Sequence, residues 1–125
     1  MSVRLLVACC VLTGFACSTS GVTNPTTAVA PIQIDGVDVL LMESFPVQVT
    51  AHVEGVVGDG CSTVLPLEMS RSGNLVTISI LRERPVDAVC TQIARLYDER
   101  IPLGTFASGE YVLRVNDVER SFRVD

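Results

Sequence analysis

Short runs of β-branched and aliphatic residues, broken by Gly, Pro, Asn and Asp, occupy the chain from Ile32 onward. Seven of these runs have the length of a β-strand, and the residues between them favour turns. Their ranges are 32–42, 47–53, 62–69, 75–81, 91–101, 110–115 and 118–124. Seven short strands at this spacing predict a β-sandwich, in which two sheets enclose one core.

Several of these runs alternate between apolar and polar residues. In the run 47–53, valine or alanine stands at each odd position, with Gln48, Thr50 and His52 between them. The run 75–81 places valine or isoleucine at positions 76, 78 and 80 in the same manner. Because successive side chains of a strand point to opposite faces, each run offers one apolar face and one more polar face. This pattern is typical of a half-buried antiparallel sheet.

The segment 109–124 predicts a β-hairpin. Asn116 and Asp117 form a two-residue connection between two apolar runs, and both residue types tolerate the positive φ of a type I′ turn. With the turn at this place, Tyr111 shares a face of the hairpin with Phe122. We therefore expect these two strands to be neighbours in one sheet.

The sequence GEYVLRVNDVERSFRV at 109–124 resembles the last hairpin of many bacterial extracellular immunoglobulin-like and fibronectin-like domains. Together with ESFPVQV at 43–49 and PVDAVC at 85–90, it resembles uncharacterised single-domain bacterial lipoproteins. The resemblance covers most of residues 32–125. It implies an all-β fold, an immunoglobulin-like antiparallel β-sandwich of about seven strands, and an extracytoplasmic location. The resemblance implies no catalytic residues.

Residues 1–16 have the composition of a secretory signal peptide, because Arg4 is their only charge and an apolar run fills 5–12. The sequence GFAC at 14–17 resembles the lipobox of bacterial lipoproteins, which implies that Cys17 is acylated and becomes the first residue after cleavage. An ordinary secretory signal cut after Ala16 is the alternative. Residues 17–31 are rich in Ser, Thr, Gly and Pro and predict a flexible tether, which leaves one domain at 32–125.

The cysteines fit this organisation. Cys9 and Cys10 would leave with the signal peptide and Cys17 would carry lipid, so Cys61 and Cys90 remain as one pair in an oxidising compartment. A disulfide between them closes a loop of about 30 residues. The chain-entropy model values such a closure at about 3 to 4 kcal/mol.

The charge of the chain restricts its partners. Its nine basic residues are all arginine, and 14 carboxylates oppose them. An acidic surface without lysine argues against a nucleic-acid partner and against electrostatic binding to anionic lipid, because both require clustered positive charge. We therefore expect attachment to the membrane through the lipid on Cys17 rather than through charge.

The residues that could perform chemistry are few. The single histidine, His52, lies within a predicted strand on the face opposite the valines, so we interpret it as a surface residue. Phosphate-binding, metalloprotease, esterase and CxxC motifs are absent from the sequence. The acidic pairs Asp98–Glu99 and Glu83–Asp87 are interpreted as solvated charges. We expect a protein that is not an enzyme, with no catalytic residue and no cofactor.

Metal ligands are also scarce. Cys61, Cys90 and His52 do not make a tetrahedral set, so we predict no metal centre. Asp35, Asp38 and Asp59 lie in turn contexts, but their spacing matches no known calcium loop, and calcium binding is left open.

Binding is the remaining class of function. The disulfide would bring the region 55–61 close to 84–90, so we name Arg84, Pro85, Asp87 and Asp59 as a candidate contact loop. The simpler interpretation is that the bridge only stabilises a small core. We expect a lipid-anchored interaction or accessory module in the bacterial cell envelope, with an envelope protein as partner. The alternative is a secreted inhibitor or small-ligand-binding domain that uses the loops at one end of the sandwich.

Overall fold

The computed structural model describes residues 26–125. The predicted signal peptide, Cys17 and most of the predicted tether lie outside these residues. The strands are β1 (Thr27–Pro31), β2 (Gln33–Met42), β3 (Val47–Gly58), β4 (Thr63–Val64), β5 (Glu68–Ser72), β6 (Leu75–Ser79), β7 (Leu81–Pro85), β8 (Arg95–Phe106), β9 (Gly109–Val115) and β10 (Val118–Val124). Residues 26–125 contain no helix that could cross a membrane.

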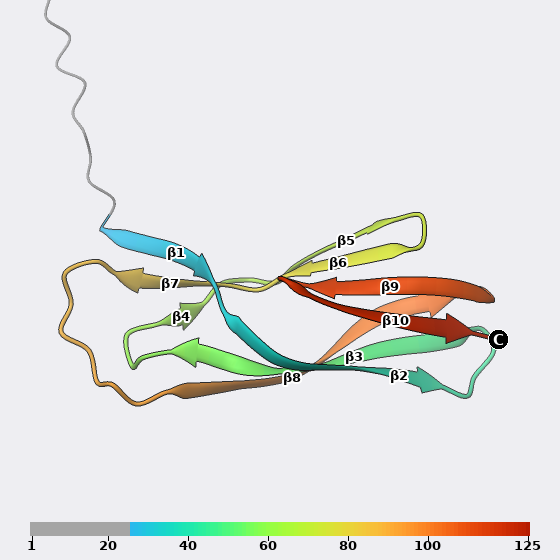
Figure 1. The fold of residues 1–125 in the computed structure, drawn as a ribbon, viewed down its shortest axis with the longest axis horizontal. Helices are drawn as coiled ribbons and strands as arrows, with labels where there is room; N and C mark the ends of the chain where they lie inside the picture. The colour runs from blue at the N-terminus through green and yellow to red at the C-terminus, as the bar shows by residue number, and fades with distance from the viewer. Residues whose placement is uncertain (1–25) are drawn as a thin grey trace, which may run out of the picture.

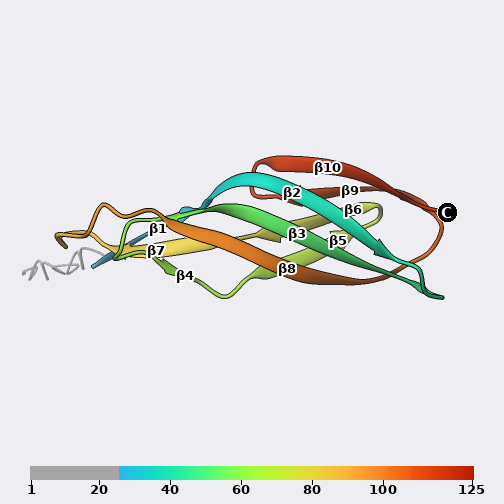
Figure 2. The ribbon, with the colours of Figure 1, turned by 90° about the horizontal axis from the view of Figure 1, so that it is seen from below.

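The strands form an elongated sandwich (Figures 1 and 2). One layer is the sheet β2-β3-β8, and the other contains the sheet β10-β9-β6-β5. A third sheet, β1-β7-β4, continues this second layer, because β6 and β7 are separated by Ile80 alone. The prediction of an all-β sandwich is confirmed. Among the described pairings, β6 with β9 is the parallel one, and the others are antiparallel.

Strand boundaries differ from the predicted runs in four main places. The run 47–53 continues as β3 to Gly58. The run 62–69 is divided into β4 and β5 by a segment containing Pro66, which has no N–H to donate to a sheet. The run 75–81 is divided into β6 and β7, where the chain passes from one sheet to another. The strand predicted at 91–101 instead begins at Arg95 and continues to Phe106. Pro102 is tolerated within it because β8 is an edge strand.

The tether prediction is wrong for Thr27–Pro31, which forms β1 and pairs with β7. This segment shows no hydrophobic period because four of its five side chains are exposed. Pro31 ends the strand and β1 lies at a sheet edge, so the missing N–H costs no ladder hydrogen bond. The folded domain therefore begins about five residues before Ile32, and the chain passes from one layer to the other at Ile32.

The core lies between the two layers and follows the predicted alternation. In β3, Val49, Ala51 and Val53 are buried, whereas Glu54 is exposed. The buried cluster contains Ile32, Ile34, Val37, Val49, Ala51, Val53, Val76, Ile78, Ile80, Ile101, Leu103, Phe106, Tyr111, Leu113, Val115 and Val124. The side-chain hydroxyl of Tyr111 donates to the carbonyl of Ala107 at 2.7 Å, which fixes the start of β9.

The predicted hairpin is present, with Tyr111 opposite Phe122 and Val115 opposite Val118. Its turn differs from type I′, because positive φ in the connection is confined to Asn116, at 52°. The Asn116 side chain accepts a hydrogen bond from the N–H of Ile80 at 2.9 Å. It also donates to the carbonyls of Ile32 and Ile80, each at 3.1 Å. One side chain thereby joins the hairpin to both places where the chain changes sheets.

Candidate functional site

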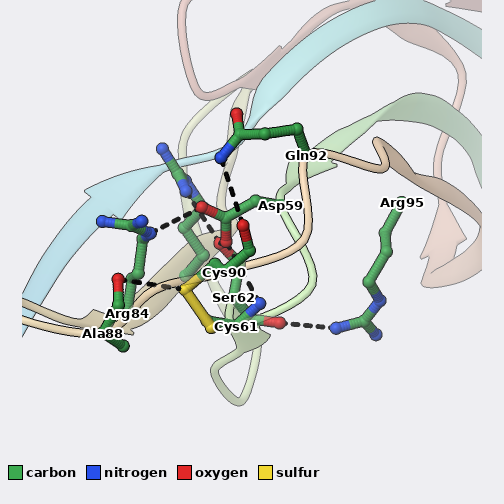
Figure 3. The surroundings of a disulfide bond; sticks show 9 residues. Asp59, Cys61, Ser62, Arg84, Ala88, Cys90, Gln92 and Arg95 are labelled. Carbon is green, nitrogen blue, oxygen red and sulfur yellow. Dashed lines mark hydrogen bonds and ion pairs between the residues drawn. A yellow bond between two sulfur atoms is a disulfide. The ribbon is translucent and has the colours of Figure 1, made fainter.

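The predicted disulfide between Cys61 and Cys90 is confirmed and defines one end of the sandwich (Figure 3). It joins the loop that follows β3 to the loop between β7 and β8, with the two Cα atoms 5.6 Å apart. A second tie lies beside it, because the N–H of Gly60 donates to the carbonyl of Thr91 at 3.0 Å. We call this region the disulfide end.

Asp59 organises the polar groups of the disulfide end. Its carboxylate accepts hydrogen bonds from Arg84 Nε at 2.7 Å, from the N–H of Cys61 at 3.1 Å and from Ser62 Oγ at 3.2 Å. Burial acts to raise the pKa of Asp59, but the hydrogen bonds and the charge of Arg84 outweigh it, so the pKa lies below the ordinary 3.8. The carboxylate is therefore held ionised, and it links the loop after β3 to Arg84 in β7.

Two further arginines converge on Ser62, which is 1% exposed. Arg82 donates to its hydroxyl at 2.9 Å, and Arg95 donates to its backbone carbonyl. Figure 3 shows Arg95 reaching the disulfide end from β8, across from Arg84. These guanidinium groups join the loop after β3 to strands β7 and β8, a structural role that sequence reasoning missed.

The candidate contact loop is only partly assembled as predicted. Arg84 and Asp59 meet, but they are engaged with each other inside the disulfide end. Pro85 closes β7, and Asp87 lies exposed in the loop that follows. The predicted loop residues therefore divide into an internal ion pair and an exposed segment.

Four large apolar side chains are exposed at this end, a feature that sequence reasoning missed. The exposed fractions are 51% for Val86, 103% for Val89, 72% for Ile93 and 81% for Leu96. The sequence contains a sign of these exposed groups, because the apolar residues in 86–96 do not follow an alternating strand pattern. We call these four side chains the apolar tip.

A second cluster lies on the outer face of the β3–β8 pair. His52 Nε2 is 2.6 Å from Asp98 Oδ1, and the ligand atoms of His52, Glu54 and Asp98 all lie within 4.8 Å of one another. The prediction of a surface histidine fits this location, because the His52 side chain keeps 21% of its exposure. One nitrogen and two carboxylates could hold a divalent cation, with water completing its shell. Asp59, Cys61 and Cys90 also lie close together, but their two sulfurs are joined in the disulfide.

An open groove of about 560 Å³ lies where the chain changes sheets, between the two layers. Its lining includes Gln33, Gly58, Arg82, Asn116 and Asp117. The Asn116 amide hydrogen-bonds to the backbone there, and Arg82 is bound to Ser62, so these two of its polar side chains are already engaged.

The model of a family described as the ORF11 beta-sandwich domain matches residues 51–124. The chain is 32% identical over 94 residues to the uncharacterized 10.2 kDa protein in the HgiCIIM 5′ region of Herpetosiphon aurantiacus, covering 74% of this chain and all of that protein. It is also 32% identical over 82 residues to the uncharacterized 10.2 kDa protein in the HgiBIM 5′ region of the same organism, covering 65% of this chain and all of that protein. No solved structure matches the chain.

Proposed function

Because the chain belongs to the ORF11 beta-sandwich domain family, whose matched relatives are themselves uncharacterised, we propose a function from its own residues. We propose that the protein is a non-enzymatic interaction or accessory module of the bacterial cell envelope, anchored by lipid on Cys17. The observation that carries this proposal is the disulfide end. There Asp59 is engaged with Arg84 and Ser62 with Arg82, while large apolar side chains are exposed.

This division of polar and apolar groups supports binding rather than catalysis. A catalytic carboxylate or base needs an open face toward a substrate, whereas Asp59 accepts three hydrogen bonds from its own surroundings. Within residues 26–125, the single histidine, His52, hydrogen-bonds to Asp98 and to no hydroxyl or thiol nucleophile. When a partner covers exposed apolar groups, in contrast, the free energy of the complex is lowered.

The anchor is supported by the sequence alone. The charged start, the apolar run 5–12 and the lipobox-like 14–17 precede a domain whose first strand begins at Thr27. Eight residues, 18–25, separate Cys17 from Thr26. They span at most about 30 Å when fully extended, so the lipid would hold the domain close to the membrane surface.

The test is to isolate the protein from its native membrane in mild detergent, after crosslinking, and to measure intact mass and companions by mass spectrometry. The proposal expects a diacylglyceryl mass on Cys17 and a membrane companion in fixed ratio. A Cys17→Ser variant should lose both the lipid mass and the membrane fraction. Unmodified protein in the medium would overturn the anchored reading and favour the alternative, a secreted inhibitor or small-ligand-binding domain acting through its end loops or the open groove.

A further inference from the structure

The apolar tip lies at the end of the sandwich where the chain enters the fold. In Figures 1 and 2 the loop between β7 and β8 and the start of β1 lie at the same end of the molecule. Pairing of Thr27 with Pro85 holds β1 there, one residue from Val86. The N–H of Val86 also donates to the carbonyl of Thr26 at 3.1 Å. Any anchor before Thr26 is therefore attached beside the apolar tip.

The backbone that carries the apolar tip is fixed by the disulfide and by hydrogen bonds to the rest of the domain. The disulfide fixes Cys90 between Val89 and Ile93, and Gly60 binds the backbone of Thr91. Asp87 and Arg95 are the charged residues in 86–96, and Arg95 donates a hydrogen bond to the carbonyl of Ser62. Four aliphatic side chains therefore project from the segment 86–96, which carries two charges and whose backbone is bound to the domain at several points.

We propose that the apolar tip inserts into the interfacial region of the lipid bilayer and so docks the domain end-on to the membrane. This inference rests on the proposed lipid attachment at Cys17. The two acyl chains of the proposed lipid hold the protein at the membrane, and burial of the aliphatic groups of the tip sets the orientation of the domain there. The net charge of the chain is −5, so the contact is apolar and does not depend on anionic lipid.

The opposite end of the sandwich also exposes apolar groups, but the chain enters the fold at the end that carries the apolar tip. Met42 and Phe45, 55% and 102% exposed, lie at the connection between β2 and β3. That connection is separated from the entry of the chain by β1 and β2, which run one after the other in the same direction (Figure 1) and together span about 50 Å. The linker of about 30 Å therefore keeps the apolar tip, and not Phe45, against the bilayer.

The chain contains no tryptophan, which allows a direct test with single tryptophan probes. Val89→Trp places the probe in the apolar tip, and Phe45→Trp is the matched control, since Val89 and Phe45 are 103% and 102% exposed at opposite ends. Both full-length variants are produced in lipidated form and reconstituted into phosphatidylcholine vesicles containing brominated lipid. Equal thermal unfolding of both variants would verify that neither substitution disturbs the fold.

We expect vesicles to shift the Val89→Trp emission to shorter wavelength and the brominated lipid to quench it at least about twofold more than Phe45→Trp. Equal quenching of the two probes in acylated, vesicle-bound protein would overturn the docking inference and leave the anchor proposal standing. Absence of a lipid mass on Cys17, with protein that does not sediment with vesicles, would overturn the anchor proposal and the docking inference together. Intact mass and sedimentation thus separate the two failures.

Discussion

At the residue scale, the disulfide end depends on one carboxylate. Asp59 joins the β3–β4 loop to β7 through Arg84 and closes its own loop through Cys61 and Ser62. Its side chain retains 16% of its exposure, so water screens these contacts in part. The ionised form is favoured in the fold, which makes this residue a source of pH-dependent stability.

We expect Asp59→Asn to remove a part of the acid sensitivity of folding. Because the folded pKa of Asp59 lies below its ordinary 3.8, its stabilisation is present above the ordinary value and is lost as pH falls through the folded pKa. Urea unfolding midpoints measured from about pH 6 to pH 3 should fall less steeply in the variant than in the wild type. Asp87→Asn, a substitution in the neighbouring exposed loop, is the control. A wild-type slope in Asp59→Asn would contradict the prediction.

Asn116 stabilises the two places, Ile32 and Ile80, where the chain passes from one sheet to another. We expect Asn116→Ala to lower the free energy of unfolding by about 2 to 3 kcal/mol, since the N–H of Ile80 and the carbonyl of Ile32 lose their hydrogen bonds to this side chain. Asn116→Gly separates the two causes, because glycine accepts the φ of 52° but makes no side-chain hydrogen bond. Chemical unfolding measures the difference. Asp117→Ala is the control, and a similar loss there would contradict the assigned role of Asn116.

At the element scale, the close approach of β2 to β3 explains why glycine stands at position 55 within a strand. The register of β2 against β3 shifts between Ile34 and Gly36, and Gly55 faces this irregularity. A Cβ on Gly55 would lie 2.2 Å from the carbonyl oxygen of Gln33, a backbone atom that cannot move aside alone. The bend of β2 toward the layer change therefore requires glycine on the neighbouring strand.

Gly55→Ala should destabilise the protein by about 1 to 3 kcal/mol, because the added methyl group forces the two strands apart. The matched control is Gly36→Ala on β2, where the nearest atom to the added Cβ is a flexible carboxylate oxygen of Glu54 at 3.6 Å. Thermal or urea unfolding of both variants measures the contrast. Equal stability of the two variants would show that the close approach at Gly55 is not maintained.

At the scale of the whole molecule, the disulfide closes the end that carries the apolar tip. Without it, the loops after β3 and β7 would be held by side-chain and backbone hydrogen bonds alone. The bridge therefore contributes to global stability and keeps the tip in a defined place beside the entry of the chain. These two effects can be measured separately.

Removing the bridge with a Cys61→Ala/Cys90→Ala double variant should lower the free energy of unfolding by about 3 to 4 kcal/mol, as the 29-residue separation implies. The expected reason is the larger conformational freedom of the unfolded chain. Denaturant unfolding of the double variant is compared with that of the oxidised wild type, and reduced wild type is the control. A double variant as stable as the oxidised protein would contradict this assignment of the bridge.

Local patterns in the sequence determined the sandwich class, the buried faces of β3 and β6, the last hairpin and the pairing of Cys61 with Cys90. These follow from alternation over two residues, from turn chemistry and from counting cysteines, which need no knowledge of distant neighbours. The tertiary structure alone decided that Thr27–Pro31 is a strand, because an exposed edge strand carries no hydrophobic period.

The tertiary structure also decided the parallel pairing of β6 with β9, the meeting of three arginines at the disulfide end and the position of the apolar tip beside the chain entry. Each of these joins segments far apart in the chain. Their geometry depends on how two twisted layers pack around one core, and no local pattern in the sequence carries that information.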